Sequence, residues 1–288
     1  MPTTRTGILR VGSVGGGGGT TGCPAAEGVL RNVSTISVVI PAYNDAVMLR
    51  ECLDRLRNQI RPADEIIVVD NASTDDTAEV AASLGATVVH QPVRGIFPAA
   101  SAGYDATSGD IIARLDADSR PPTDWLAHIE AEFTLSSDVS VLTGPGEFYD
   151  GNAVVTWLGE NLYIGGYFWF GALWLDNGPI FGSNFAMRRD VWMRVRDRVH
   201  RNVRRVHDDL DLSLHLPPDV VVRVDDTLRV GISARPFSSW RGFGRRLGWA
   251  YLTFRMNWPD ASPWRLREER EKYLLARNSG EGDATSTV

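Results

Sequence analysis

The sequence is poor in cysteine and has no long apolar run, and each absence excludes a class of protein. Its 288 residues contain two cysteines, Cys23 and Cys52, too few for a disulfide framework or a zinc site of their own. A reducing, cytoplasmic compartment agrees with this count. Residues 1–34 lack the apolar core of a secretory signal peptide. The longest apolar stretch, Leu162 to Leu175, is too short to cross a bilayer, so we expect no transmembrane helix.

Acidic residues outnumber basic residues over the chain as a whole, by 36 to 30. The net charge of −6 and the pI near 5.4 argue against a nucleic-acid-binding protein, which usually carries a basic surface. The exception is the aromatic region from Arg235 to Arg277, with ten Arg or Lys residues against four Asp or Glu residues. Either this region lies on an anionic membrane, or its helices pack on the rest of the chain with a solvated basic face. The oligomeric state is not indicated.

Composition divides the chain into segments. Five consecutive glycines, Gly15 to Gly19, make residues 1–34 unable to offset their conformational entropy by burial, so we expect a disordered leader there. An ordered domain follows over 35–234, with halves at 35–134 and 135–234. We expect a basic, aromatic, helical extension over 235–278 and a flexible tail over 279–288.

Strand and helix patterns alternate in the first half of the domain. Short β-branched runs predict buried strands at 36–41, 65–70, 86–90 and 110–115. Helical patterns lie at 45–59 and 97–107, and a third helix is expected to be capped at 73–76 and to end near Leu84. This alternation predicts an α/β fold with a mostly parallel, Rossmann-like sheet flanked by helices. In such sheets, ligands bind beyond the carboxyl ends of the strands.

Polar clusters follow three of these strands, namely Tyr43-Asn44-Asp45, Asp70-Asn71 and Asp116-Ala117-Asp118. If the backbone stays extended after the fourth strand, Asp116 and Asp118 point to the same side. Paired carboxylates suit a hard cation such as Mg²⁺ or Mn²⁺, and such a metal neutralises charge on a diphosphate leaving group. We therefore predict a metal site at Asp116 and Asp118.

The other two clusters have the groups needed to bind a nucleotide. Tyr43 offers a flat face to a base, and Asn44 offers amide donors and acceptors. Asp70 can accept a hydrogen bond from a ribose hydroxyl or a base imide. The alternative is that Asp70 and Asn71 only form a turn and a cap.

Residues 36–134 resemble the nucleotide-binding half of family 2 glycosyltransferases, which have the GT-A fold. The matching segments are Val38–Asn44, Ile67–Asp75 and Leu115–Asp118. The resemblance implies a nucleotide-sugar donor and a divalent metal, with Asp118 on the metal and Asp116 on ribose or metal-bound groups. It also implies a nucleotide site formed by Pro41, Tyr43, Asn44, Asp70, Asn71 and Ser73.

The sequence departs from the family pattern at two places in this half. Asp45 stands where the family commonly has Glu. Ala100-Ser101 replaces the Arg-Asn pair that many members carry before the fourth strand. Either the positive contact to the diphosphate is missing in this chain, or Arg94 supplies it from the preceding loop.

Two segments of the second half, Gly182–Arg189 and Asp208–Ser213, resemble the acceptor side of the same family. The resemblance places Asn184 and Asp208 near the acceptor and makes Asp209 the catalytic base, which takes a proton from the acceptor hydroxyl. The alternative is that these aspartates cap a helix.

Three further side chains near this half have two interpretations each. His207 or His215 is either an extra metal ligand or a packed histidine. Trp157 begins an aromatic segment over 157–175 that either stacks on a sugar or lipid or belongs to the core.

These features predict a metal-dependent, inverting glycosyltransferase, with a role in cell-envelope or polysaccharide synthesis. It would move a sugar from a nucleoside-diphosphate sugar to a hydroxyl of a glycan, lipid-linked or small-molecule acceptor, in the cytoplasm or at the inner face of the membrane. A sugar nucleotidyltransferase is disfavoured because Pro41-Ala42-Tyr43 stands where a glycine-rich basic loop is usual. A non-catalytic nucleotide-sugar-binding module is disfavoured because it needs no Asp209.

Overall fold

A computed structural model describes residues 34–151, 164–175, 177–235 and 240–280, so the predicted leader and Trp157 lie outside the described residues. A seven-stranded sheet has the order β3-β2-β1-β4-β7-β5-β8. The four strands predicted from the sequence are all present, as β1 (Ile36–Ala42), β2 (Glu65–Asp70), β3 (Thr87–His90) and β4 (Ile111–Leu115). They pair in parallel, which confirms the mostly parallel α/β fold.

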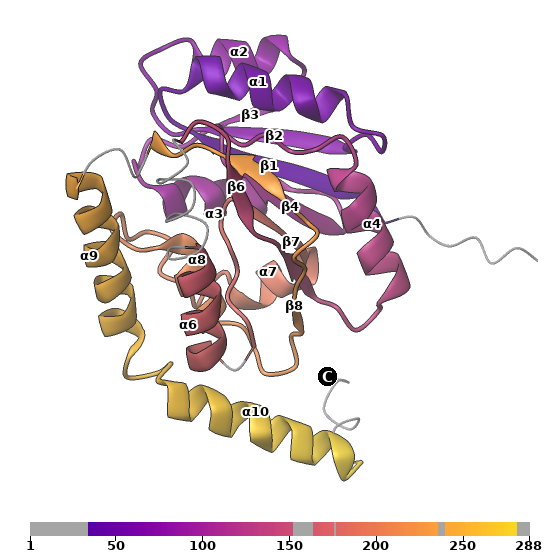
Figure 1. The fold of residues 1–288 in the computed structure, drawn as a ribbon, viewed down its shortest axis with the longest axis vertical. Coiled ribbons are helices and arrows are strands. Elements are labelled where there is room, and N and C mark those ends of the chain that lie inside the picture. Colours follow the sequence, from indigo (N-terminus) through magenta and orange to yellow (C-terminus); the bar gives the residue numbers. More distant parts are fainter. Residues whose placement is uncertain (1–33, 152–163, 176, 236–239, 281–288) are drawn as a thin grey trace, which may run out of the picture. The chain divides into compact units, whose positions relative to one another are not determined.

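Helices connect these strands and cover both faces of the sheet (Figure 1). They are α1 (Ala46–Arg57), α2 (Thr77–Ser83), α3 (Ile96–Ala106) and, after β4, α4 (Trp125–Leu135). The helix α2 begins directly after the predicted cap segment, and its N-cap residue, Asp76, makes no capping hydrogen bond through its side chain. The carboxylate of Asp75 accepts the backbone N–H of Thr77 at 3.1 Å. The hydroxyl of Ser73 accepts the backbone N–H of Asn44 at 3.1 Å.

The alternation of side chains along β1 builds a core on each face of the sheet. Val38 and Ile40 pack with residues of α1 and α4, whereas Val39 packs with residues of α3. On this second face, α3 lies very close to the strands, since a Cβ atom built on Gly103 would come within 2.4 Å of Val39. Burial on both faces explains why β1 is a continuous apolar run.

The second half extends the sheet with one reversed strand. This strand, β7 (Asn184–Arg188), lies antiparallel between β4 and β5 (Val141–Thr143), and Asn184 pairs with Leu115. The start of β7 therefore lies beside the carboxyl end of β4, which brings Gly182 and Ser183 to Asp116. The remaining elements are β6 (Gly146–Phe148), α6 (Gly165–Leu175), α7 (Arg189–Val195), α8 (Asp208–Leu214), β8 (Val222–Val224) and β9 (Val230–Ile232).

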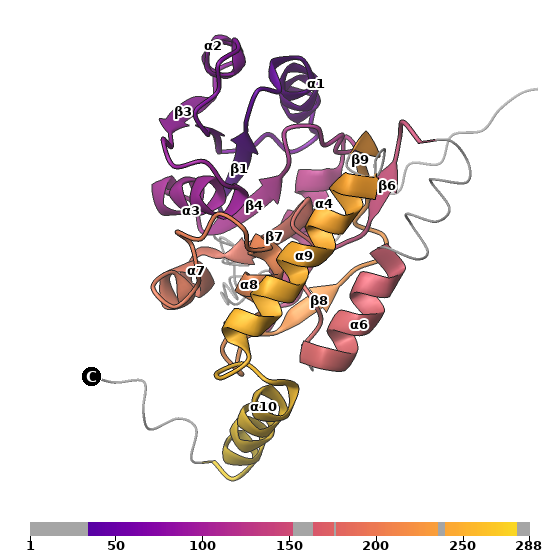
Figure 2. The ribbon, with the colours of Figure 1, turned by 90° about the vertical axis from the view of Figure 1, so that its left-hand side faces the viewer.

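The expected C-terminal helices are α9 (Trp240–Asn257) and α10 (Pro263–Asn278). Figure 2 shows α9 running across the side of the sheet that carries α8. The ring of Trp174 on α6 lies 4.8 Å from that of Phe254 and 5.8 Å from that of Trp258, measured between centroids. In the described part of the chain, every helix is too short or too polar to cross a bilayer.

Candidate active site

A cleft with a volume of about 780 Å³ opens beyond the carboxyl ends of β1 and β4. Most of the predicted site residues line it, namely Pro41, Tyr43, Asp45, Asn71, Arg94, Asp116, Asp118, Asp208 and Asp209. The first seven lie at the carboxyl end of β1 or in the turns after β1, β2, β3 and β4, and the two aspartates come from α8. The cleft therefore lies beyond the carboxyl ends of the strands, where open α/β sheets usually bind their ligands.

The expectation that Asp116 and Asp118 share one face of an extended strand is wrong, because the backbone turns at Ala117 and Asp118. The turn is held by Ser119, whose hydroxyl accepts the N–H of Asp116 at 3.1 Å. The two carboxylates still line the same cleft but have separate partners. That of Asp116 accepts a hydrogen bond from Ser183 Oγ at 2.6 Å.

The carboxylate of Asp118 holds a cation that belongs to the chain itself. The guanidinium of Arg235 lies 2.9 Å from Asp118 and makes two bonds of 3.0 and 2.8 Å to Asp45. Burial, together with the charge of Asp116, raises the pKa of Asp118 against the opposing effect of Arg235. The space between Asp45 and Asp118 thus attracts positive charge, which fits a metal site.

A buried ion pair crosses the floor of the cleft. Arg114 is 2% exposed, and its guanidinium contacts Asp208 and lies 3.0 Å from the carboxylate of Asp116. Burial alone would lower the pKa of Arg114, but the charges of Asp208, Tyr104 and Asp116 outweigh it and raise that pKa well above its usual value. Because Asp208 is itself buried, burial raises the pKa of its carboxyl, and Arg114 counters this effect. Asp208 therefore serves Arg114 rather than a ligand.

Asp209 is the carboxylate of α8 that faces the cleft. Its Oδ2 accepts the backbone N–H of Gly182 at 3.0 Å, and its side chain is 15% exposed. A Cβ atom built on Gly182 would lie 3.0 Å from both this oxygen and Arg114, so the position leaves little room for a side chain. The start of β7 thereby fixes the orientation of Asp209.

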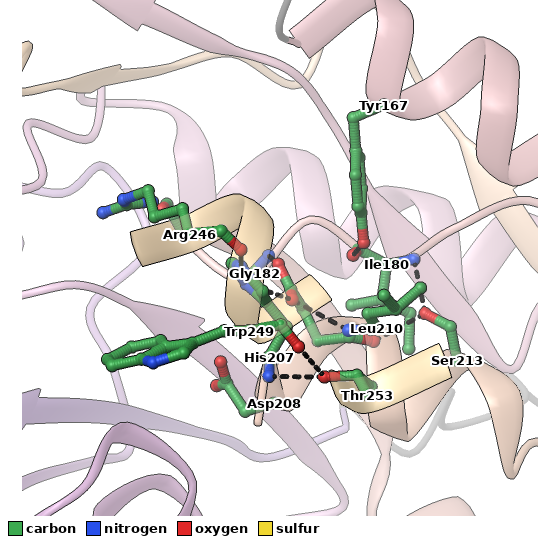
Figure 3. A network of polar contacts seen from close by, with 12 residues as sticks. Tyr167, Ile180, Gly182, His207, Asp208, Leu210, Ser213, Arg246, Trp249 and Thr253 are labelled. Atoms are coloured by element: carbon green, nitrogen blue, oxygen red, sulfur yellow. Dashed lines mark hydrogen bonds and ion pairs between the residues drawn. The ribbon is translucent and has the colours of Figure 1, made fainter. Parts of the chain in front are cut away.

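His207 lies beside Asp209, and Figure 3 shows it next to Arg246, Trp249 and Thr253 of α9. Its Nε2 donates to the carbonyl of Arg246 at 3.0 Å, and its backbone N–H donates to Thr253 at 3.0 Å. The proton on Nε2 leaves Nδ1 facing Asp209, at 3.8 Å from Oδ1. His207 lines the cleft with Trp249, whose ring centroid is 6.3 Å away.

Tyr43 and Arg94, which both line the cleft, contact each other. The guanidinium of Arg94 lies over the Tyr43 ring, 3.4 Å from its centroid, and donates to the Tyr43 hydroxyl at 2.6 Å. Asn71 shapes the loop that carries Arg94, because it donates to the carbonyls of Gln91 and Val93 and accepts the N–H of Gly95. Asn71 is thus a positioning residue for Arg94.

Three of the residues expected to bind the nucleotide are instead used within the turns. Asn44, with a φ of 47°, accepts the N–H of Thr74 at 2.7 Å and donates its own N–H to Ser73. Asp70 accepts the N–H of Ser73 at 3.1 Å and lies 3.2 Å from His90. None of the three lines the cleft, and Asp70 matches the turn-and-cap alternative.

Two residues expected on the acceptor side or the metal lie elsewhere. Asn184 is wholly buried, with its amide oxygen accepting from Trp125 and its amide nitrogen donating to the carbonyls of Leu228 and Pro145. The expectation that it meets the acceptor is wrong, because every polar atom of its side chain is used in the core. His215 lies outside the cleft and donates to the carbonyl of Asp211 at 2.8 Å.

Several basic residues of the cleft were not predicted. Arg114 had a signal in the sequence, because a charge inside a buried strand requires a partner. Arg204, Arg205 and Arg246 also line the cleft. They had no signal, because an arginine in a polar loop or on a basic helix is usually solvated.

Comparisons with known proteins agree with this geometry. The chain matches the family model described as glycosyl transferase family 2 over residues 37–195. It is 31% identical over 131 residues to Glycosyltransferase AglE of Haloferax volcanii, covering 42% of this chain and 40% of that protein. It is 29% identical over 128 residues to the dolichol-phosphate mannosyltransferase of Pyrococcus furiosus, covering 42% and 36%. The match spans less than half of either relative.

Solved structures show the same architecture. The mannosyltransferase PcManGT from Pyrobaculum calidifontis, in complex with GDP-Man and Mn²⁺, superposes with a TM-score of 0.63 at 20% identity, over 88% of this chain and 76% of that one. Glucosyl-3-phosphoglycerate synthase from Mycobacterium tuberculosis, in complex with Mn²⁺, UDP-glucose and phosphoglyceric acid, superposes with a TM-score of 0.53 at 23% identity, over 77% and 78%. Since the family model covers more than half of the sequence, the chain belongs to glycosyl transferase family 2 and has the GT-A fold.

Proposed function

We propose that this chain is a metal-dependent, inverting glycosyltransferase that moves a sugar from a nucleoside-diphosphate sugar to an acceptor hydroxyl. The observation that carries the proposal is that Asp118, in the turn after β4, and Asp209, on α8, are 19% and 15% exposed and line the same cleft. Asp118 can then hold the metal that neutralises the leaving group, while Asp209 takes the proton of the acceptor hydroxyl.

Asp118, with Asp116 beside it, is the residue that would hold the divalent metal. The chain already places the cation of Arg235 there, at 2.9 Å from Asp118, so the position accommodates positive charge. When bound, Mn²⁺ or Mg²⁺ would neutralise the negative charge that develops on the departing diphosphate. Arg235 would have to leave Asp118 for the ion to enter, and its side chain is 48% exposed.

Asp209 is the residue that would take the proton of the acceptor hydroxyl. One of its oxygens is fixed by the N–H of Gly182, and the other lies near His207. The neighbouring Asp208 is paired with the buried Arg114, so it is a poor base. This division of roles agrees with an inverting transfer, which requires one general base.

At the other end of the cleft, Tyr43 would stack on the base of the nucleotide. Arg94 now covers a face of this ring. A base that takes this place would release the guanidinium toward the donor diphosphate. Stacking of the base on Tyr43 and contact of Arg94 with the diphosphate would therefore both follow when the base displaces Arg94 from the Tyr43 ring.

Replacement of Asp118, the residue proposed to bind the metal, tests the proposed function. We expect Mn²⁺ with the correct nucleotide-sugar to stabilise the wild-type protein by about 2.7 kcal/mol when the ligand is at roughly 100 times its Kd. Asp118→Ala should lose this metal-dependent stabilisation and the consumption of donor. Thermal-shift assays with a panel of nucleotide-sugars, with and without Mn²⁺, measure the first effect, and nucleoside-diphosphate release measures the second.

The exposed Asp138, in the loop after α4, provides a matched control. Asp138→Ala should behave as the wild type in both assays. Transfer that persists undiminished in Asp118→Ala, or in an excess of chelator, would contradict the metal role. A wild-type protein that binds a donor but never consumes it would favour a binding module.

The C-terminal helices support a second part of the proposal, a site of action on an anionic membrane surface in envelope or polysaccharide synthesis. Tyr251 on α9 is 69% exposed and Trp264 on α10 is 68% exposed, in a region that carries six more positive than negative charges. Relatives of the chain include an undecaprenyl-phosphate 4-deoxy-4-formamido-L-arabinose transferase of Pseudomonas fluorescens.

Vesicle binding tests this part separately. We expect the protein to float with vesicles that contain anionic lipid, to float less at high salt, and to ignore zwitterionic vesicles. Tyr251→Ser with Trp264→Ser should weaken the binding several-fold, since each change removes an exposed aromatic anchor. Absence of flotation with anionic vesicles would leave the alternative, a solvated basic face.

A further inference from the structure

The arginines of the cleft divide into those with a carboxylate partner and those without one. Arg114 is neutralised by Asp208 and Asp116, and Arg235 by Asp45 and Asp118. Arg204 and Arg205 are different. They are exposed and line the cleft, and within the described ranges no carboxylate or other polar group pairs with their guanidinium groups.

Arg204 and Arg205 belong to the loop that enters α8, the helix that carries Asp209. The same loop meets the loop of Arg94, because a Cβ atom built on Gly95 would lie 3.4 Å from Cα of Arg204. Arg94, Arg204 and Arg205 therefore form a positive margin between the Tyr43 end and the Asp209 side of the cleft. We call these three residues the arginine rim.

We propose that Arg204 and Arg205 bind a phosphate group carried by the acceptor. This inference rests on the proposed function, in which the charge of the donor diphosphate is met on the other side of the cleft by the metal at Asp118. Two consecutive arginines that both line the cleft, and that have no carboxylate partner among the described residues, can then bind a second anion, because guanidinium N–H donors match the oxygens of a phosphate. Trp249, Ile96 and Phe181 also line the cleft and would contact the apolar or sugar part of the same molecule.

Matched acceptors test the inference. Glycerol 3-phosphate against glycerol, and farnesyl phosphate against farnesol, separate a soluble phosphate from a lipid phosphate while keeping the rest of each molecule constant. We expect ligand-observed NMR, in chelator and without donor, to show binding of at least one phosphorylated member and of neither alcohol. Arg204→Ala with Arg205→Ala should weaken this binding by roughly 10- to 100-fold, and the double lysine variant should recover part of it.

The control is Arg57→Ala, which removes an exposed arginine of α1 outside the cleft and should bind as the wild type does. In steady-state transfer to the phosphorylated acceptor, the double alanine variant should raise the acceptor KM and leave the donor KM unchanged. A raised donor KM with an unchanged acceptor KM would assign Arg204 and Arg205 to the donor diphosphate and overturn the inference. Equal binding of phosphate and alcohol would also overturn it.

The proposed function can fail independently of this inference. Donor hydrolysis without any acceptor reports on the metal and on the donor, and we expect it to be unchanged in Arg204→Ala with Arg205→Ala. A wild-type protein that hydrolyses no donor but binds the phosphorylated probe through these arginines would refute the transferase proposal and retain the phosphate site.

Discussion

Replacing Asp209 by Asn is expected to lower the rate of sugar transfer by about 10²- to 10⁴-fold, the contribution that a positioned general base usually makes. The side chain keeps its size, and its amide oxygen can still accept the N–H of Gly182, which now lies 3.0 Å from Oδ2, while the N–H of Leu210 loses the bond of 2.8 Å that it now makes to Oδ1. The fold should therefore survive while the acceptor hydroxyl loses its proton acceptor. Single-turnover transfer, with donor binding measured in parallel, separates the two effects.

Donor affinity should change little in Asp209→Asn, because the assigned metal ligand is Asp118. Asp226→Asn, an exposed aspartate in the turn before β9, is the matched control and should keep full activity. If Asp209→Asn equals the wild type in both donor hydrolysis and transfer, the assignment of the base is wrong. If donor affinity falls as far as the rate does, Asp209 contributes to the metal site instead.

The second large effect is expected at the buried pair of Arg114 and Asp208. Arg114→Met should lower the free energy of unfolding by about 3–5 kcal/mol, because it leaves the carboxylate of Asp208 buried without its counter-charge. The pair is well shielded, with 2% of the Arg114 side chain and 9% of the Asp208 side chain exposed. Urea unfolding of the full chain measures the change.

A double variant distinguishes the cost of an unpaired charge from the loss of a contact. Arg114→Met with Asp208→Leu should recover most of the stability, since a buried ion pair can often be replaced by apolar side chains without net loss. It should remain impaired in metal-dependent donor binding, because Arg114 also lies 3.0 Å from the carboxylate of Asp116. A double variant no more stable than Arg114→Met, or a loss below about 1 kcal/mol in Arg114→Met, would contradict this account.

The strands and the polar turns of the nucleotide half were predicted well because their causes are local. The β-branched runs at β1 and β4 are buried on both faces of the sheet, so their mainly apolar character identified them, even with Arg114 inside β4. Parallel strands share one carboxyl edge, so Tyr43 and Asp116 had to lie on the same side of the sheet. The start of α2 at Thr77 agrees with the cap predicted at 73–76, although the N-cap residue, Asp76, makes no capping bond through its side chain.

The resemblance to the family located segments better than side chains. It placed Asp208, Asp209 and Asn184 on the acceptor side, and the segments that carry them do border the cleft. The direction of each side chain, however, depends on the neighbours that pack against it. Asn184 turns inward to Trp125, and Asp208 turns to Arg114, which leaves Asp209 as the carboxylate beside the cleft.

The sequence by itself determined the α/β pattern, the polar turns that follow the parallel strands, and the identity of the carboxylates. These features depend on residues that are neighbours along the chain. Only the tertiary structure decided which charges meet. The pairing of Arg235 with Asp45 and Asp118 joins residues 190 and 117 positions apart, and that of Arg114 with Asp208 joins residues 94 positions apart. No local pattern encodes such pairs, because they depend on the reversed strand β7 and on the path of the chain after it. Arg204 and Arg205, which have no carboxylate partner among the described residues, likewise stand out only in the tertiary structure.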